Sequence, residues 1–284
     1  MLTIIIPSKT EKYFKRTIEE VLEKATGEIE VLACTDGYEE TDKVNDSRVL
    51  YLSIPMSEGN HKRHLINLAV KESKGEYIMV LDAHCMVGKG FDEILIRDHQ
   101  PNWVQIPRRL RLDAENWKLE EDERPPVDYE YWKWQDFKKG WIHGYKWDSR
   151  TLERMNIPID EDMTFQGSCY FMTKDWFHKL GLMQIEGFGG FTQEADEIAC
   201  KVRSFGGKVM VNKNTWYAHL HKGKKYGRMY DLNWEEKRAG DNYAFDYFVN
   251  KNREHFVAHV EHFWPIPNWP ENWKDYLPKK ETDE

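Results

Sequence analysis

Asp82 and His84 carry side chains that commonly bind metal ions, and a single residue separates them. They directly follow residues 77–81, an apolar run with the length and composition of a strand buried on both faces of a parallel sheet. Residues i and i+2 of an extended chain point to the same side, so the carboxylate and the imidazole can reach one ion. In open α/β sheets, ligands bind at the carboxyl ends of the strands, where this pair would lie. The pattern indicates a metal site, and its plain alternative is a strand that ends in polar turn residues.

The segments around this pair alternate between strand-like and helix-like patterns. Short β-branched runs bounded by turn residues predict strands, and apolar residues at helical spacing predict amphipathic helices. Strands that alternate with helices form βαβ units with right-handed crossovers, so we expect an α/β fold with a mostly parallel sheet flanked by helices. The expected strands are 2–6, 29–34, 49–54, 77–81, 103–106 and 208–212, and the expected helices are 12–24, 59–73 and 194–203.

The composition limits the class of protein. The chain has 284 residues, of which 40% are hydrophobic and 14% aromatic, enough for one large α/β domain or two small ones. Its net charge of −8 argues against a protein that coats nucleic acid through a general basic field, although a local basic groove is compatible with it. Four cysteines without a CxxC pair, no signal-peptide pattern and no apolar run of membrane-spanning length predict a soluble, cytoplasmic protein with reduced thiols.

Short motifs stand in order along the first hundred residues: Ile5-Ile6-Pro7-Ser8, Thr35-Asp36-Gly37, Gly59 with Lys62-Arg63, and Gly75-Glu76-Tyr77 before Leu81-Asp82-Ala83-His84. This set resembles the nucleotide-binding half of GT-A glycosyltransferases of the family-2 type. Most of those enzymes carry DxD, and the DxH followed by Cys found here is similar to the metal motif of polypeptide N-acetylgalactosaminyltransferases. The resemblance implies a Rossmann-like, mixed and mostly parallel GT-A sheet, and a divalent ion, Mn²⁺ or Mg²⁺, that neutralises a nucleotide diphosphate. It also implies that Asp36 pairs with the nucleotide base. The donor-binding residues it suggests in this half are Pro7, Ser8, Asp36, Arg63 and Asp82.

The resemblance continues in the second half of the chain. Residues 164–171 are similar to the strand beside the donor sugar, with Gly167 and Ser168 as the residues that let the backbone come close. Gln166 departs from the small residue that is usual there. In the relatives a helix begins with Gly-Gly-Glu-x-x-Glu, whereas in this chain Phe191, Thr192 and Gln193 separate Gly190 from Glu194.

Acidic residues at the start of that helix are the candidate catalytic groups. By the register of the helix, Glu194 and Glu197 match the two carboxylates of the family. We expect Glu194 to be the catalytic carboxylate, with Asp196 as the second choice and Glu197 on the acceptor side. Acidic residues at a helix N-terminus also complement the helix dipole, which is the plain alternative.

A histidine near residue 220 is implied as a third metal ligand by the same relatives. His219 is our first choice and His221 the reserve. A basic, glycine-containing segment follows at 222–228, and we expect it to close over the diphosphate, although an ordinary surface loop would have the same composition. Its candidate phosphate-binding residues are Lys222, Lys225 and Arg228.

Residues 129–147 are rich in aromatic side chains. Such rings stack on sugars or on exposed bases, and they equally form the core of an irregular subdomain. The acceptor-binding residues that we predict are Arg108, Arg109, Trp132, Trp134 and Glu197.

The expected organisation is one catalytic domain at 1–232, divided into a nucleotide-binding half at 1–100 and a donor-sugar and acceptor half at 101–232, with an extension at 233–284 packed on it. The expected function is metal-dependent transfer of a sugar from a nucleotide-diphosphate sugar, with UDP as the nucleotide, to an acceptor hydroxyl. The acceptor is a glycan, a protein or, as in some phage enzymes, hydroxymethylated pyrimidine DNA, and inversion or retention stays open.

Two other classes of protein share part of these features. Metallophosphoesterases also begin with DxH, but they place their GNH block after it, whereas residues 59–61 precede it here. A non-catalytic carbohydrate-binding module would use the aromatic segment but would not need the metal ligands.

Overall fold

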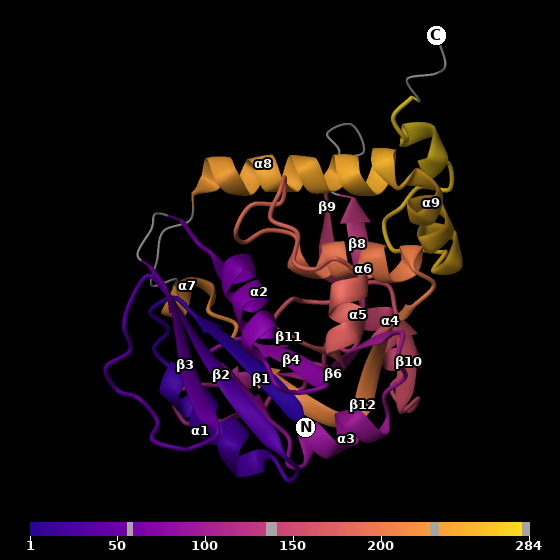
Figure 1. Cartoon of the computed structure of the whole chain (residues 1–284). Helices are drawn as coiled ribbons and strands as arrows, with labels where there is room; N and C mark the ends of the chain where they lie inside the picture. The colour runs from indigo at the N-terminus through magenta and orange to yellow at the C-terminus, as the bar shows by residue number, and fades with distance from the viewer. Residues whose placement is uncertain (56–58, 135–140, 228–232, 280–284) are drawn as a thin grey trace.

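A mixed β-sheet runs through the centre of the molecule (Figure 1). The structure is a computed structural model, and it describes residues 1–55, 59–134, 141–227 and 233–279. The strand order is β10-β12-β6-β11-β4-β1-β2-β3, with β5 paired to β12 and β7 to β6. The strands of this sheet are β1 (Leu2–Ser8), β2 (Ile29–Asp36), β3 (Val49–Ile54), β4 (Tyr77–Leu81), β5 (Cys85–Val87), β6 (Trp103–Asp113), β7 (Lys118–Leu119), β10 (Ile159–Asp162), β11 (Cys169–Thr173) and β12 (Lys208–His219).

Helices flank this sheet, and α8 runs across its upper end in Figure 1. The α-helices are α1 (Phe14–Lys24), α2 (Lys62–Glu72), α3 (Phe91–Arg97), α4 (Asp148–Glu153), α5 (Lys174–Lys179), α6 (Glu194–Ser204), α7 (Gly223–Tyr226), α8 (Trp234–Phe245) and α9 (Arg253–His262). A π-helical segment, Asp246–Lys251, joins α8 to α9, and a 3₁₀ turn, Trp273–Tyr276, follows.

The first hundred residues form the predicted βαβ arrangement. Strand β1 is parallel to β2 and β4, and β2 is parallel to β3. All seven residues of β1 are buried, as expected of a strand covered by helices on both faces. The predicted α/β class with a mixed, mostly parallel GT-A sheet is therefore confirmed.

The later strands differ from the expected ones in length. Strands β6 and β12 continue to Asp113 and His219, well beyond the predicted ends at 106 and 212. Their pairing shifts in register between Asn212 and Trp216, and this irregularity lets one long strand continue past a break in its pattern. The strand expected over 164–171 begins only at Cys169, so Gln166, Gly167 and Ser168 form the turn that enters it.

The aromatic segment forms a hairpin of β8 (Glu130–Trp134) and β9 (Ile142–Lys146). Trp132 is fully buried and stacks on Phe248 and Phe256 of the C-terminal region, at ring-centre distances of 5.9 and 5.6 Å. Trp269 Nε1 also donates a hydrogen bond of 2.7 Å to the carbonyl of Trp132. The hairpin and the C-terminal helices thus share one core, which explains why the hairpin lies under α8 in Figure 1.

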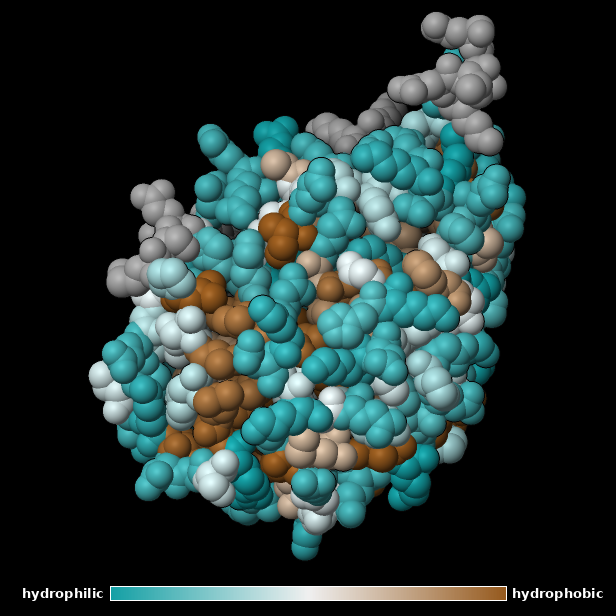
Figure 2. Space-filling view, viewed as in Figure 1, coloured by the Kyte–Doolittle hydropathy of each residue, from teal (hydrophilic) through white to brown (hydrophobic). Residues whose placement is uncertain are grey.

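The outer surface is mainly hydrophilic on the face that Figure 2 shows, apart from a hydrophobic band over the β1–β3 side. Strand β3, at the end of the strand order, is only partly covered, and Leu50 on it is exposed. Among the described residues, no helix has the length and apolar character needed to span a membrane.

Candidate active site

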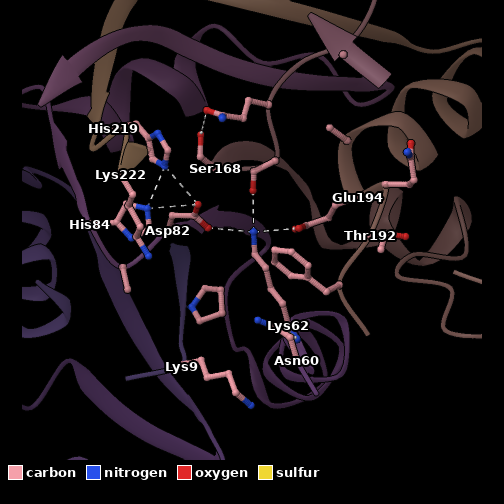
Figure 3. A pocket seen from close by; sticks show the side chains of 18 of the residues that line it. Lys9, Asn60, Lys62, Asp82, His84, Ser168, Thr192, Glu194, His219 and Lys222 are labelled. Atoms are coloured by element: carbon pink, nitrogen blue, oxygen red, sulfur yellow. Dashed lines mark hydrogen bonds and ion pairs between the residues drawn. The ribbon is translucent and has the colours of Figure 1, made fainter. Parts of the chain in front are cut away.

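Strand register brings Asp82, His84 and His219 together at the end of β4. His219 pairs with Cys85 in the antiparallel ladder of β12 and β5, which places it beside His84. The Nε2 atoms of His84 and His219 lie 3.0 Å apart. Asp82 Oδ2 lies 3.5 Å from His219 Nε2 and 3.9 Å from His84 Nε2 (Figure 3). One carboxylate and two imidazoles therefore point at a common centre.

The donor set fits a divalent metal ion. Three ligand atoms that each lie about 2.1 Å from one ion are separated by roughly 3–4 Å, as these are. Burial lowers the pKa of His219 to about 3, so its imidazole is neutral, the form that binds metals. The facing Nε2 atoms of His84 and His219, 3.0 Å apart, repel each other unless a proton or a cation lies between them. On the other side of its ring, His84 Nδ1 lies 3.4 Å from Glu11 Oε2, a neighbour that favours the tautomer with Nε2 free.

Lys62, the first residue of α2, lies at the centre of the pocket in Figure 3. Its Nζ is 3.0 Å from Asp82 Oδ1 and 2.9 Å from Glu194 Oε2, and it donates to the Gly167 carbonyl at 2.8 Å. Burial by itself would lower the pKa of Lys62, but the two carboxylates outweigh it and hold that pKa above its usual value. Burial likewise opposes the charge of Asp82, and Lys62 with the two histidines holds its pKa well below the usual range. Lys62 is not among the donor-binding residues predicted from the sequence, which include its neighbour Arg63.

A close packing of loop and helix brings Lys62 and Glu194 together. The carbonyl of Gly190 accepts a hydrogen bond of 2.9 Å from the Arg63 amide at the start of α2. A Cβ at position 190 would lie 2.0 Å from the carbonyl oxygen of Asn60, so only glycine allows this approach. Four residues after Gly190, Glu194 begins α6, and its side chain therefore faces the first turn of α2.

Glu194 and Asp196 both line the pocket, but their hydrogen bonds differ. Glu194 contacts Lys62 through Oε2 and accepts from the Tyr170 hydroxyl at 3.1 Å through Oε1. Asp196 Oδ1 accepts from Trp132 Nε1 at 2.8 Å and from Thr164 Oγ1 at 2.9 Å. Burial raises the pKa of Asp196 to about 7. Asp196 therefore links the β8–β9 hairpin to α6, which leaves Glu194 as the better placed candidate for a catalytic carboxylate.

Asp36, the last residue of β2, lines the part of the pocket that lies against the central sheet. Its Oδ2 accepts from Lys9 Nζ at 3.0 Å and from the His61 amide at 2.9 Å, and its Oδ1 lies 3.1 Å from His61 Nδ1. Pro7 and Ser8, at the end of β1, line the same region. These contacts hold the Asp36 carboxylate toward the pocket.

The pocket has a volume of about 1120 Å³, slightly above the usual range of roughly 300–1,000 Å³ for ligand sites. It has room for a nucleotide sugar and part of an acceptor. The predicted residues that line it are Pro7, Ser8, Asp36, Asp82, His84, Gly167, Ser168, Glu194, Asp196, His219, His221 and Lys222.

The segment expected to close over the diphosphate is only partly described. Its first part is the single-turn helix α7 and not an irregular loop, and Lys222 Nζ contacts Glu11 Oε1 at 2.5 Å beside the metal ligands. The side chain of Lys225 and the whole of Arg228 lie outside the described part of the chain.

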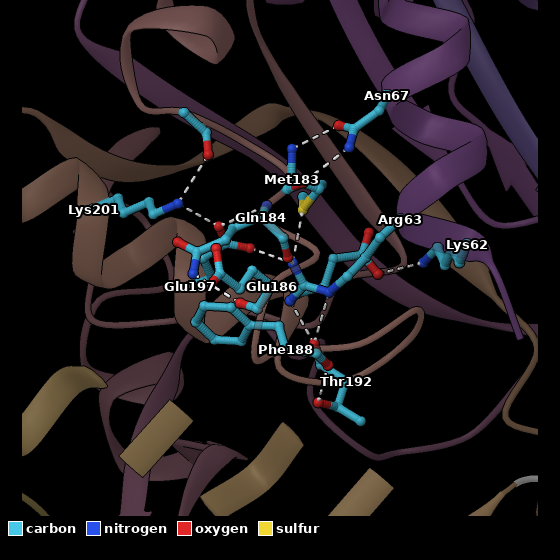
Figure 4. A network of polar contacts seen from close by, with 12 residues as sticks. Lys62, Arg63, Asn67, Met183, Gln184, Glu186, Phe188, Thr192, Glu197 and Lys201 are labelled. Carbon is cyan, nitrogen blue, oxygen red and sulfur yellow. Dashed lines mark hydrogen bonds and ion pairs between the residues drawn. The ribbon is translucent and has the colours of Figure 1, made fainter. Parts of the chain in front are cut away.

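Arg63 and Glu197 lie behind the pocket, in the buried network of Figure 4. Both side chains are fully buried and form an ion pair, and Lys201 Nζ contacts the same glutamate at 2.5 Å. Arg63 also donates to the carbonyls of Thr192 and Gln184, each at 3.1 Å. Successive helix residues point about 100° apart, so Lys62 and Arg63 face different sides. The direct donor contact expected of Arg63 and the acceptor contact expected of Glu197 are replaced by an internal link between α2 and α6.

The predicted acceptor-binding residues on β6 and β8 are likewise turned inward. Arg108 pairs with Asp128 at 2.7 Å, and Trp132 and Trp134 are buried among the C-terminal aromatic residues. Arg109 is buried and contacts Glu130 at 2.5 Å. These four residues support the pocket wall but do not line the pocket in this structure.

A pocket at the strand ends of a mixed sheet, with a candidate DxH metal site beside a lysine and a glutamate, is the arrangement of the GT-A class. The chain belongs to glycosyl transferase family 2, whose members match residues 3–181, more than half of its length. The resemblance stated from the sequence is thereby confirmed.

Two proteins show how far the similarity extends. The chain is 27% identical over 164 residues to putative polypeptide N-acetylgalactosaminyltransferase 13 of Drosophila melanogaster, which covers 54% of this chain and 26% of that protein. The crystal structure of GalNAc-T7 with UDP, GalNAc and Mn²⁺ superimposes with a TM-score of 0.69 at 15% identity, over 98% of this chain and 55% of that one. The chain thus spans about a quarter and about half of their lengths, and the structural likeness shows the shared GT-A fold.

Proposed function

We propose that this chain is a metal-dependent glycosyltransferase that moves a sugar from a UDP-sugar to an acceptor hydroxyl. The observation that carries the proposal is the convergence of Asp82, His84 and His219 at 3.0–3.9 Å, next to the Lys62–Glu194 ion pair. The binding of UDP and Mn²⁺ by the structural neighbour supports it. We extend the catalytic domain over 1–232 and assign 233–284 as an extension that shapes its acceptor side.

The triad would hold a divalent ion, which supplies a positive charge that stabilises the leaving diphosphate. Lys222, held beside the triad by Glu11, adds a second cation on the same side. Asp36 offers a carboxylate to the N3 hydrogen of uracil, because a carboxylate accepts hydrogen bonds but does not donate them. The pocket therefore orders the donor with the base near Asp36 and the diphosphate near the triad.

Glu194 then lies where the sugar and the acceptor meet. In an inverting reaction, its carboxylate would take the proton of the acceptor hydroxyl as that oxygen attacks the anomeric carbon. In a retaining reaction, the same carboxylate would orient the sugar or the acceptor. Lys62, within 2.9 Å, keeps the Glu194 side chain in place.

The experiment that tests the proposal is UDP release from a set of UDP-sugars, with Mn²⁺ and with a chelator. The proposal predicts release from at least one sugar donor, and the chelator should abolish it. Release that is insensitive to the chelator, or no release from any donor, would contradict it. Hydrolysis of a plain phosphomonoester would instead favour the phosphoesterase alternative, which the family match does not support.

A further inference from the structure

The pocket continues beyond Glu194 to an end formed by the β8–β9 hairpin, the start of α6 and helix α8. We call this part the α8 end, and its side chains are Glu130, His143, Gln193, Trp234, Lys237 and Asp241. Asp36 and the metal ligands come from the central sheet, whereas these residues come from the segments that cross above it in Figure 1. If the donor lies along the sheet, as the proposed function requires, the α8 end is where the acceptor enters.

Among the described residues, two polar atoms at the α8 end are buried without a hydrogen-bond partner, His143 Nδ1 and Gln193 Oε1. Burial lowers the pKa of His143, so its ring is neutral. The amide of Gln193 already donates to Asp241 Oδ1 at 3.0 Å, which leaves its carbonyl oxygen open. Buried polar groups are usually satisfied, so these two atoms indicate a ligand with hydrogen-bonding groups. A sugar hydroxyl both donates and accepts, and it can therefore satisfy either atom.

The charges at the α8 end are paired with one another. Among its described residues, Lys237 is the one lysine or arginine, and its Nζ contacts Asp241 Oδ2 at 2.5 Å. Glu130 is paired with Arg109 behind the wall at 2.5 Å. A phosphodiester backbone requires unpaired cations for its charge, and the described residues of this end do not provide them. The α8 end is polar and close to neutral.

An exposed indole stands at the edge of this region. Trp234, the first residue of α8, lines the pocket and has 67% of its surface exposed. Lys237, one turn further, lies 5.6 Å from the ring centre of Trp141, which is also exposed. Flat indole faces stack well on the apolar C–H face of a pyranose, while the ring hydroxyls remain free for polar partners.

We infer that the α8 end is an acceptor site for a neutral saccharide, with Trp234 stacking on the sugar ring and His143 and Gln193 bonding its hydroxyls. The inference rests on the proposed function, because an acceptor site requires a sugar donor bound next to it. It places the acceptor hydroxyl next to Glu194, which follows Gln193 directly in the chain.

The test uses the whole chain with Mn²⁺ and the UDP-sugar that supports UDP release. Three kinds of acceptor are compared: methyl glycosides and neutral oligosaccharides, a serine- and threonine-containing peptide, and a single-stranded oligonucleotide with hydroxymethylcytosine. Neutral saccharides should stimulate UDP release and receive the sugar, as detected by mass spectrometry. Stimulation by the peptide or the oligonucleotide, with the saccharides inert, would overturn the inference but leave the proposed transferase intact. No metal-dependent UDP binding and no UDP release would overturn the proposed function itself.

Two variants locate the site. Trp234→Ala and His143→Ala should each raise the KM for the saccharide about tenfold, with a much smaller change in the KM for the UDP-sugar. The matched control is Phe205→Ala, an exposed aromatic residue at the far end of α6, which should leave both KM values unchanged. Trp234 is mostly exposed, so its replacement does not endanger folding. If the KM for the saccharide is unchanged in both variants, the acceptor does not bind at the α8 end.

Discussion

Lys62 Nζ lies 2.9 Å from Glu194 Oε2, which joins the first residue of α2 to the first residue of α6 inside the pocket. The same ammonium group lies 3.0 Å from Asp82, so one buried cation connects the metal site to the candidate catalytic carboxylate. Removing one partner of a buried ion pair leaves an uncompensated charge, and here it would leave two neighbouring carboxylates. The geometry therefore makes Lys62 a positioning residue for both.

Replacing Lys62 by methionine should lower turnover by about 100-fold or more, because the oriented charge beside the reacting centre is lost. It should also reduce the free energy of unfolding by roughly 3–5 kcal/mol, which denaturant titration measures. Lys71→Met, an exposed lysine on the same helix, is the matched control and should change neither quantity. Normal turnover in Lys62→Met would show that the ion pair has no part in the reaction.

Glu194→Gln should lower turnover by about 100-fold or more while UDP still binds in the presence of metal, because an amide cannot take a proton or carry the charge. Asp196→Asn should be milder, since the Asp196 carboxyl accepts hydrogen bonds from Trp132 and Thr164 and an amide oxygen can do the same. Steady-state kinetics of both variants show which substitution lowers turnover more. Full loss of activity in Asp196→Asn with near-normal turnover in Glu194→Gln would move the catalytic role to Asp196.

The raised pKa of Asp196 predicts a pH dependence of stability. The folded-state pKa of about 7 lies above the usual aspartate value of 3.8, so the folded state binds the proton more tightly. The resulting stabilisation is complete below about pH 4 and is lost as the pH rises toward 7, with a slope of at most about 1.4 kcal/mol per pH unit. Asp196→Asn should lack this component. Denaturant unfolding of both proteins between these pH values measures this component of the free energy of unfolding. If that free energy changes with pH in the same way in both proteins, the pKa of Asp196 is not raised.

Asp36→Ala should remove a preference for UDP over GDP and ADP. The carboxylate is held toward the pocket by Lys9 and His61, where it can accept the N3 hydrogen of uracil. We expect UDP to bind the unmutated protein at least about tenfold more tightly than the other two, as one well-placed hydrogen bond to a charged group allows. Asp42→Ala, whose exposed carboxylate pairs with Lys15, is the control. Equal affinities in the unmutated protein would contradict the assigned role of Asp36.

The fold of the first hundred residues could be predicted because local pattern and tertiary structure agree there. The apolar runs of β1 and β4 indicate strands buried on both faces, and the common direction of Asp82 and His84 follows from the alternation of side chains at the end of β4. His219 could be chosen from its place in the order of motifs. Its position beside His84 depends on the register of β12 with β5, which no local pattern specifies.

The positions of the remaining site residues depend on packing between segments that are distant in the sequence, so no local pattern predicts them. Lys62 and Arg63 are adjacent basic residues, and the docking of the Gly190 loop on α2 determines which of them faces the pocket. The Trp132 indole has an aromatic face and an N–H donor, which suits an acceptor site, but Phe248 and Phe256 cover that face. Helix α8 belongs to the extension that was expected only to pack on the domain, yet Trp234, Lys237 and Asp241 of this helix line the pocket.

Calorimetric titration of UDP tests the central claim, that Asp82, His84 and His219 bind an ion that holds the nucleotide. The unmutated protein should bind UDP with Mn²⁺ and lose most of that affinity with a chelator. His219→Ala should weaken the metal-dependent binding by about 10- to 100-fold, whereas His221→Ala, two residues further along, should retain it. UDP affinity that is the same with Mn²⁺ and with chelator, or unchanged in His219→Ala, would contradict the account.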